Sequence, residues 1–508
     1  MPSSLTYTHL STSQRLELKT LGDLKAAGYM PISVKEELRQ NLIQALESGK
    51  SAFEGIYGYE DTVIPQLERA ILSRHNINLL GLRGQAKTRL ARLMVNLLDE
   101  YVPIVAGSEL NDDPLAPLSL YARTQIETFG DQTPIAWLPR QERYTEKLAT
   151  PDVTVADLIG DIDPIKAANL KISYSDERSI NFGLIPRTHR GIFVINEIPD
   201  LQARIQVALF NILQEGDIQI RGFKIRLPLD IQFVFTANPE DYTNRGSIVT
   251  PLKDRIGSQI ITHYPPTIEV SKKITQQEAQ VKTEQKNRVQ TFEFSDNLLE
   301  AIAFTARESE LVDAKSGISA RLTISAYENL ISTAERRAIL NKEPHTYLRI
   351  SDFMGIVPAL AGKVELVYEG EQEGAGIVAQ SLINKSLRNI FTQYFPNPEK
   401  EKKNKINLYK NLLDWFEAGN TLELLNDLST ADYEAKLDSV PFLKKIVLAK
   451  MPTLKGAELY LMMEFCLHGL AEYSAIGRKN LDNALTFSDL LSGMFSLPQE
   501  DDDEEDDY

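Results

Sequence analysis

Short apolar runs alternate with longer segments of helical spacing between residues 55 and 265. Four runs have the length and composition of buried strands, at residues 77–80, 191–195, 231–237 and 259–264. Apolar side chains at helical spacing follow the first run, from Leu90 to Leu98. Strand-like runs that alternate with helical segments are typical of an α/β layer with a parallel sheet. We therefore predict an α/β core in this part of the chain.

The flanking regions have different patterns. One amphipathic helix is predicted near residues 34–46, and residues 268–348 and 377–498 have mainly helical spacing. Residues 108–139 are rich in Asp, Pro and aromatic residues, and we expect an insertion of low regularity there. We predict five regions: an N-terminal helical leader (1–54), the α/β core (55–265), a helical lid (266–360), a linker with a further C-terminal helical region (361–498) and a disordered acidic tail (499–508).

Composition and charge narrow the class of protein. Of the 508 residues, 43% are hydrophobic, which is enough for sizeable cores, and the net charge is −16. A negative charge of this size disfavours nonspecific binding to nucleic acid. The single cysteine, Cys466, is expected to be a small buried hydrophobe. No apolar run reaches the roughly 18 residues that span a membrane and no signal peptide is recognised, so we expect a cytoplasmic protein.

The segment Gly81-Leu-Arg-Gly-Gln-Ala-Lys-Thr88 lies between the first apolar run and the first helical segment. A glycine-rich loop in this position has backbone N–H groups that can bind nucleotide phosphates, helped by the N-terminus of the following helix. Lys87 would then contact the β- and γ-phosphates, and the Thr88 hydroxyl would bind Mg²⁺. The predicted nucleotide-binding residues are Gly81, Gly84, Gln85, Ala86, Lys87 and Thr88. The alternative is a glycine-containing loop before an ordinary helix.

Ala86 departs from the usual P-loop pattern. Glycine normally precedes the lysine, and a Cβ is costly where the backbone needs a positive φ. Alanine is the smallest residue that carries a Cβ. We therefore expect nucleotide binding to survive this change.

Two polar residues follow the apolar run 191–195. Ligands bind at the carboxyl ends of parallel strands, and Asn196 and Glu197 lie at this end. Glu197 could polarise an attacking water molecule. Asn196 occupies a position where Asp normally supports Mg²⁺. An asparagine can accept a hydrogen bond from a metal-bound water but brings no charge, so we expect weaker Mg²⁺ affinity or slower turnover. The alternative is that both residues cap the next helix.

Three further residues complete a candidate catalytic set. Asn238 ends the run 231–237 and could orient the water molecule. Arg255 is a candidate arginine finger that would act in trans on the transferred phosphoryl group. Arg321 opens a predicted helix and offers a second arginine to the phosphates. Each has a structural alternative, such as a turn at Asn238 or a surface ion pair at Arg255.

Taken in this order, the motifs resemble those of the AAA+ ATPases, specifically the clade of the magnesium chelatase I subunit and the MoxR-like proteins. Two more segments support the resemblance: one at 160–186, similar to the helix-2 insert of that clade, and one at 216–227, similar to its pre-sensor-1 hairpin. The resemblance covers about residues 55–350. The GAFTGA loop of sigma-54 activators is absent from the sequence.

The resemblance implies a P-loop core with three αβα layers, a helical lid, and ATP and Mg²⁺ as cofactors. It also implies a homo-oligomeric ring, usually of six subunits, in which Arg255 reaches the site of the next subunit. Glu197, Asn238, Arg255 and Arg321 would be the catalytic residues, and Thr88 and Asn196 the metal ligands. The implied partner is a protein client, which in this clade often contains a von Willebrand factor A domain.

Four functions stay open at this point. The leading hypothesis is an ATPase that remodels or assembles a protein partner. The alternatives are the ATPase subunit of magnesium chelatase, a nucleotide-binding scaffold with little turnover, and a nucleic-acid translocase that uses the basic residues Arg221, Lys224 and Arg226. We expect neither a membrane nor a nucleic-acid partner.

Overall fold

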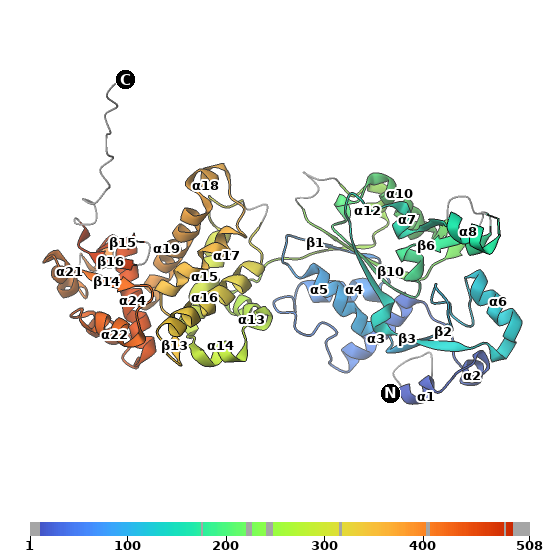
Figure 1. Cartoon of the computed structure of the whole chain (residues 1–508), viewed down its shortest axis with the longest axis horizontal. Coiled ribbons are helices and arrows are strands. Elements are labelled where there is room, and N and C mark those ends of the chain that lie inside the picture. Colours follow the sequence, from blue (N-terminus) through green and yellow to red (C-terminus); the bar gives the residue numbers. More distant parts are fainter. Residues whose placement is uncertain are drawn as a thin grey trace, which may run out of the picture. The chain divides into compact units, whose positions relative to one another are not determined.

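The structure is a computed structural model that describes residues 11–173, 176–219, 226–239, 247–313, 317–402, 407–481 and 484–490. The chain divides into two compact units, residues 1–264 and residues 265–508 (Figure 1). Each unit has its own hydrophobic core and is described separately below.

A five-stranded sheet forms the centre of the first unit. Its strand order is β11-β1-β10-β7-β4, and every neighbouring pair is parallel. The strands are β1 (Ile77–Leu80), β4 (Tyr144–Leu148), β7 (Gly191–Asn196), β10 (Ile231–Ala237) and β11 (Ser258–Ile261). The predicted α/β class with a parallel sheet is confirmed.

Helices cover both faces of this sheet. Ile192 and Val194 of β7 belong to a core cluster with α3 (Val34–Glu47), α4 (Val63–Leu72) and α5 (Lys87–Leu93). The alternate residues Phe193 and Ile195 belong to a second cluster with α10 (Ala203–Glu215) and α12 (Thr250–Asp254). Successive side chains of a strand point to opposite faces, so the strand is apolar throughout because both faces are covered.

The remaining elements of this unit lie around the three layers. They are α1 (Thr12–Leu16), α2 (Leu21–Ala26), β2 (Tyr101–Val105), α6 (Leu120–Phe129), β3 (Ile135–Pro139), α7 (Val155–Leu158), β5 (Gly160–Ile162), α8 (Pro164–Leu170), β6 (Ile180–Phe182), α9 (Leu184–Arg187), β8 (Asp217–Gln219) and β9 (Arg226–Pro228), with short 3₁₀ turns between them. Three pairs of these strands are antiparallel: β2–β3, β5–β6 and β8–β9.

Two sequence expectations need correction here. Residues 108–139 were expected to have low regularity, but they contain α6 and β3, and β3 pairs with β2 over five residue pairs. The strand β4 was not predicted. Its sequence, Tyr-Thr-Glu-Lys-Leu, mixes polar and apolar residues because it forms an edge of the sheet. Arg221 and Lys224, in the predicted basic hairpin, lie outside the described residues.

The second unit is mainly helical. Its helices are α13 (Ile268–Glu278), α14 (Thr283–Arg288), α15 (Glu293–Arg307), α16 (Arg321–Leu340), α17 (Val357–Ala361), α18 (Tyr368–Glu373), α19 (Ala375–Tyr394), α20 (Pro398–Glu401), α21 (Lys410–Glu417), α22 (Thr430–Asp438), α23 (Leu443–Lys450) and α24 (Ala457–Glu472). Its strands are β12 (Val289–Gln290), β13 (Thr346–Tyr347), β14 (Leu422–Leu425), β15 (Gly477–Leu481) and β16 (Ala484–Ser488).

One apolar core runs through this second unit. The helix α24 lies inside it and is buried around most of its circumference, as expected of a helix that is apolar on all sides. Cys466 is fully buried on this helix, which confirms its expected role as a small hydrophobe. The C-terminal region also contains an antiparallel sheet of order β14-β16-β15, where only helices were expected.

Candidate nucleotide-binding site

The strand order of the central sheet brings the predicted site residues together. The P-loop follows β1, Asn238 follows β10, and Asn196 ends β7. These three strands are adjacent and parallel, so their carboxyl ends lie at one edge of the sheet. This is the edge where open α/β sheets bind ligands.

The residue before Lys87 in the P-loop has a positive φ, the conformation in which a Cβ is costly. Ala86 has φ 56° and ψ 16°, in the left-handed region, and immediately precedes α5. Gly84 also has a positive φ of 72°. A left-handed alanine costs roughly 1–2 kcal/mol relative to a glycine, which is affordable for a loop held by its surroundings. Ala86 therefore takes the backbone position of the usual glycine.

Side chains from distant segments hold the loop. The Tyr59 hydroxyl donates to the carbonyl oxygens of Gln85 (3.0 Å) and His263 (2.7 Å). The Thr262 hydroxyl donates to Oε1 of Gln85 at 2.7 Å. A Cβ added to Gly81 would lie 2.0 Å from Thr262 Oγ1, so this position needs a glycine for packing.

Lys87 and Asn238 are in direct contact. The Lys87 ammonium group donates to Oδ1 of Asn238 at 2.8 Å and to the carbonyl oxygen of Leu82 at 2.9 Å, and it also contacts the carbonyl oxygen of Gly81. Both side chains are buried, with Lys87 7% and Asn238 3% exposed. A buried ammonium group needs oxygen partners, and phosphate oxygens are suitable replacements for loop carbonyls.

Glu197 lies beside Asn238. The Asn238 amide donates from Nδ2 to Oε2 of Glu197 at 3.0 Å. Glu197 is half-buried and has φ 56° and ψ 49°, one of nine non-glycine residues with a positive φ in the described part of the chain. The chain of contacts Lys87–Asn238–Glu197 thus joins the three strand ends.

Asn196 and Thr88 form the second half of the site. The Thr88 hydroxyl donates to Oδ1 of Asn196 at 3.3 Å, and the Thr236 hydroxyl donates to the same oxygen at 3.0 Å. Asn196 is 7% exposed. A hydroxyl oxygen and an amide oxygen this close together are hard donors of the kind that Mg²⁺ prefers.

Glu146 belongs to the same cluster, and the sequence interpretation missed it. Its Oε1 accepts from Nδ2 of Asn196 at 2.7 Å. It lies on the edge strand β4, next to β7 in the sheet. The only sequence signal would have been a glutamate within a weak strand pattern, and that pattern does not distinguish Glu146 from other exposed glutamates.

The residues present fit a nucleotide with Mg²⁺. The lysine, the threonine hydroxyl, the amide oxygen and two carboxylates converge at one edge, and the loop has the left-handed turn that exposes backbone N–H groups. Within the described part of the chain, no group of three or more His, Cys, Asp or Glu side chains could hold a metal ion alone. Mg²⁺ is often bound by one or two protein groups together with phosphates and water, so this observation agrees with the fit.

The two candidate arginines are described by their own contacts. Arg255 follows α12 and contacts Asp254, the ring of Phe210 at 5.3 Å and Oε1 of Gln214 at 3.5 Å. Its side chain is 36% exposed. Arg321 is exposed and is the first residue of α16 in the second unit. The predicted roles of both arginines as phosphate contacts stay predictions.

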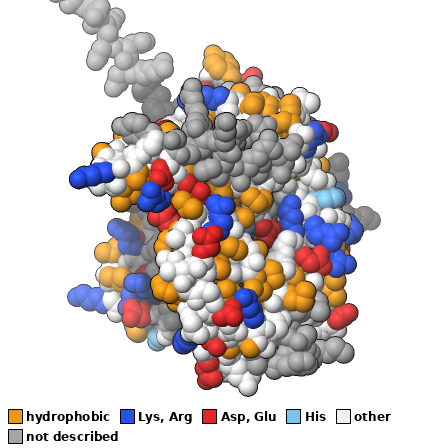
Figure 2. Space-filling model, turned by 90° about the vertical axis from the view of Figure 1, so that its right-hand side faces the viewer, with side chains coloured by type: hydrophobic (Ala, Val, Ile, Leu, Met, Phe, Trp, Pro, Cys, Tyr) orange, Lys and Arg blue, Asp and Glu red, His pale blue; other side chains and the backbone are white. Residues whose placement is uncertain are grey.

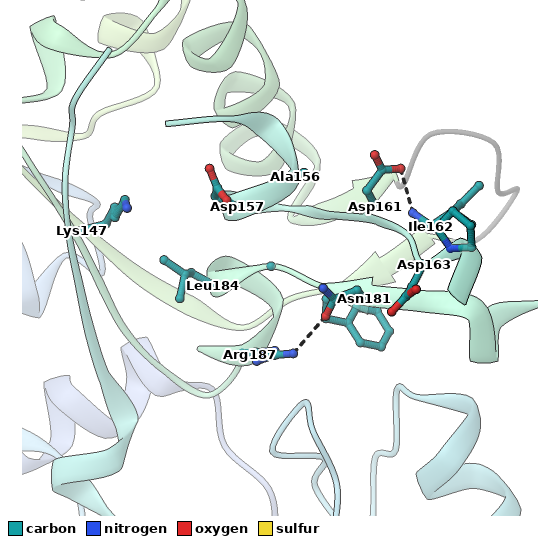
Figure 3. Close-up of a pocket in the computed structure, with 12 residues that line it drawn as sticks. Lys147, Ala156, Asp157, Asp161, Ile162, Asp163, Asn181, Leu184 and Arg187 are labelled. Atoms are coloured by element: carbon teal, nitrogen blue, oxygen red, sulfur yellow. Dashed lines mark hydrogen bonds between the residues drawn. The ribbon is translucent and has the colours of Figure 1, made fainter. Parts of the chain in front are cut away.

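A depression of about 550 Å³ is lined by residues of β4, α7, β5, α8, β6 and α9 (Figure 3). Lys147 points into it, while the adjacent Glu146 faces α5, as alternation along a strand requires. Asp157, Asp161 and Asp163 line it together with Arg187 (Figure 3). None of the predicted nucleotide-site residues lines this depression.

Figure 2 shows the face of the molecule at the right of Figure 1. On its described part, basic, acidic and apolar side chains are interspersed. A mixed surface of this kind differs from the single-sign field that attracts a nucleic-acid backbone.

Comparisons with known proteins match parts of this chain. The family described as the Sigma-54 interaction domain matches residues 169–258, which include Asn196, Glu197, Asn238 and Arg255. The match does not extend to the P-loop.

Two curated relatives are magnesium-chelatase 38 kDa subunits. The protein from Cereibacter sphaeroides is 25% identical over 194 residues, covering 38% of this chain and 52% of the relative. The protein from Rhodobacter capsulatus is 24% identical over 221 residues, covering 43% and 57%. The chain thus spans about half the length of the curated relatives it matches.

Solved structures match this chain with low TM-scores and low sequence identity. A complex between subunits BchI and BchD of magnesium chelatase has a TM-score of 0.32 at 18% identity, covering 63% of this chain and 98% of that chain. The RuvB Holliday junction branch migration motor of Thermotoga maritima has a TM-score of 0.30 at 14% identity, covering 65% and 68%. In the described residues, no helix is both long and apolar enough to cross a membrane.

Proposed function

We propose that this chain, which resembles AAA+ proteins related to the magnesium chelatase I subunits, binds and hydrolyses ATP to remodel or assemble a protein partner. The observation that carries the proposal is the contact chain from Lys87 through Asn238 to Glu197. A phosphate-binding lysine, a neutral amide and a carboxylate at one sheet edge are the groups that phosphoryl transfer to water needs.

Each residue has a distinct proposed role. Lys87 exchanges its loop carbonyl partners for phosphate oxygens and neutralises their charge. Glu197 accepts a proton from the attacking water, and Asn238 holds both the lysine and the glutamate in place. Bound Mg²⁺ would neutralise charge on the phosphates, and Thr88 and Asn196 would hold it.

The test is steady-state ATP hydrolysis by the full chain with Mg²⁺. We expect Glu197→Gln to reduce kcat by roughly 100-fold or more, because general-base catalysis typically contributes that much, while ATP binding remains. Lys87→Ala should lose ATP binding as well. The matched control is Glu142→Gln, which removes an exposed glutamate near β4 and should leave both properties unchanged. Turnover that persists in Glu197→Gln would refute the assigned role.

A mixing experiment tests whether Arg255 acts on the site of a neighbouring subunit. Arg255→Ala should reduce turnover if the arginine serves a neighbouring subunit. Mixing this variant with Lys87→Ala should then restore part of the activity, because mixed oligomers contain sites with an intact P-loop and an intact Arg255. No recovery on mixing would contradict action in trans. Arg321→Ala tests the second arginine in the same assay.

The segment 155–170 supports a protein partner. Val155, Ile165 and Leu170 are 38%, 74% and 51% exposed, and they lie on α7 and α8, which border the depression. Exposed apolar side chains beside three aspartates suit a protein surface better than a phosphate backbone. We expect Ile165→Asp with Leu170→Asp to weaken a complex with a von Willebrand factor A domain partner and to leave basal hydrolysis intact.

Asn196 supports a second candidate, a nucleotide-dependent scaffold. A neutral amide at the metal position provides less charge than a carboxylate. Nucleotide binding without measurable turnover in the wild-type protein would favour the scaffold. Assembly with the other magnesium chelatase subunits and insertion of Mg²⁺ into a porphyrin would favour the narrower enzyme function. Retention of single-stranded DNA that falls with salt would favour a translocase.

A further inference from the structure

Asn196 is neutral, whereas an aspartate at this position would carry a negative charge. The neighbours of Asn196 are therefore candidates to supply that charge. Asn196 ends β7 and accepts hydrogen bonds from Thr88 and Thr236 through its single amide oxygen. Its NH₂ group donates to Oε1 of Glu146 at 2.7 Å. An ionised carboxylate can only accept hydrogen bonds, so Glu146 fixes which end of the amide faces the two hydroxyls.

Glu146 is itself held in a defined position. Arg92 donates to both of its oxygens, from Nε to Oε2 at 2.9 Å and from Nη2 to Oε1 at 3.1 Å. The Tyr144 hydroxyl donates to Oε2 at 3.0 Å. The Glu146 side chain is 22% exposed, so the carboxylate is close to solvent while its direction is fixed by three neighbours.

The P-loop helix connects this group to the nucleotide side. Thr88 and Arg92 are four residues apart on α5 and therefore lie on one face of the helix. That face is directed at the Asn196–Glu146 pair, with Thr88 on the amide and Arg92 on the carboxylate. One face of α5 thus contacts both Asn196 on β7 and Glu146 on β4, and these two residues of adjacent strands together carry one negative charge.

We propose that Glu146 is a positioning residue for Mg²⁺, in which its carboxylate orients and polarises the Asn196 amide and supplies the negative charge that Asn196 lacks. The inference rests on the proposed function, because it concerns the same nucleotide site. Carboxylates that hydrogen-bond to a metal ligand raise the electron density on that ligand, and their loss typically reduces metal affinity 10–100-fold. Asn196 and Glu146 together therefore replace a single aspartate.

The test measures binding of the fluorescent nucleotide mant-ATP to the full chain, with Mg²⁺ and with EDTA. We expect Mg²⁺ to strengthen binding to the wild-type protein and Glu146→Gln to lose most of that gain, roughly 10-fold or more. Binding in EDTA should stay the same. Glu142→Gln is the matched control, since it removes one exposed negative charge from the same segment, and it should behave as the wild type.

A charge exchange separates positioning from simple structural support. In the double variant N196D/E146Q the carboxylate moves to position 196 and the amide to position 146, so the pair keeps one charge and one hydrogen bond. We expect this variant to regain the Mg²⁺-dependent gain that E146Q alone loses. The single variant N196D should gain less than the double variant, because two carboxylates would then face each other and repel. The unfolding midpoint of each variant serves as the folding control.

The outcomes distinguish this inference from the proposed function. If the wild-type protein binds no mant-ATP under either condition, the proposed function fails, and the inference fails with it. If the wild type shows a Mg²⁺-dependent gain that E146Q keeps, only the inference is overturned. It is also overturned if E146Q loses the gain and N196D/E146Q does not recover it, because the charge would then be irrelevant.

Discussion

Two arginine–glutamate pairs at β4 have the same chemistry and opposite surroundings. Arg143, directly before the strand, binds both oxygens of Glu37 at 2.7 and 2.6 Å, and the two side chains are 1% and 5% exposed. Glu146, within the strand, binds Arg92 with side-chain exposures of 22% and 63%. Both pairs are bidentate, so the hydrogen bonds alone do not distinguish them.

Burial decides what each pair can do. The Glu37 carboxylate also accepts from the backbone N–H of Asp99, and Arg143 Nε donates to the carbonyl oxygen of Arg190. These bonds engage the buried pair in structural contacts and link α3 to the sheet. The open pair leaves Glu146 in contact with Asn196, and so with the candidate metal position. An ion pair near the protein surface can therefore serve a ligand, whereas a buried one serves the fold.

The largest expected effect is on stability. Glu37→Gln should reduce the free energy of unfolding of the N-terminal unit by about 3–5 kcal/mol, because Arg143 would stay buried without its counter-charge. The same substitution at the open pair, Glu146→Gln, should cost less than about 1 kcal/mol. Urea unfolding measures both in a Trp415→Phe background, where Trp137 of the first unit is the only remaining tryptophan. Equal losses would contradict the comparison.

A smaller effect should depend on pH. His189 is buried beside Arg190, its Nδ1 accepts from the backbone N–H of Asp230 at 3.0 Å, and burial lowers its pKa from 6.5 to about 3. The unfolded chain therefore binds the proton more tightly, so the stability contribution is complete above pH 6.5 and is lost as the pH falls toward 3. Between pH 6.5 and 5.5 the loss amounts to about 1 kcal/mol, because the unfolded histidine is already half protonated at pH 6.5.

His189→Asn keeps a hydrogen-bond acceptor but cannot titrate, so it should remove this loss. The measurement is the difference in urea stability between pH 6.5 and 5.5 for the variant and for its parent. Burial raises the pKa of Asp230 to about 6, which gives the opposite slope in both proteins and therefore cancels in the comparison. A variant that loses as much stability as its parent over this interval would refute the role of His189.

The smallest effect concerns the strained loop on the open side. Ala86→Gly relieves a left-handed alanine, and we expect the unit to gain up to about 1 kcal/mol, since glycine also adds flexibility to the unfolded chain. Urea unfolding in the Trp415→Phe background, followed by Trp137 fluorescence, measures this gain in stability. A loss of stability would show that the Ala86 methyl group contributes more through packing than its backbone conformation costs.

Much of the fold was predictable because parallel strands buried on both faces are recognisable in the sequence as continuous apolar runs. The runs at 77–80, 191–195 and 231–237 correspond to β1, β7 and β10 within one residue, since side chains on both faces of these strands are covered and must be apolar. The edge strand β4 has no such constraint, and it was missed. The helix α6, within residues 108–139, was missed because Asp, Pro and aromatic residues in this segment obscure its short periodic pattern.

The amino-acid pattern alone indicates the strand ends, the glycine-rich loop and the polar residues that follow each strand. It therefore predicts that Lys87, Asn196, Glu197 and Asn238 belong to one site. The packing of the sheet adds Glu146 to them and leaves out Arg143, three residues earlier. The physical reason is that strand order and burial are collective properties of the packed sheet: the neighbours of β4 and the depth of each side chain decide whether a charge meets a ligand or the core.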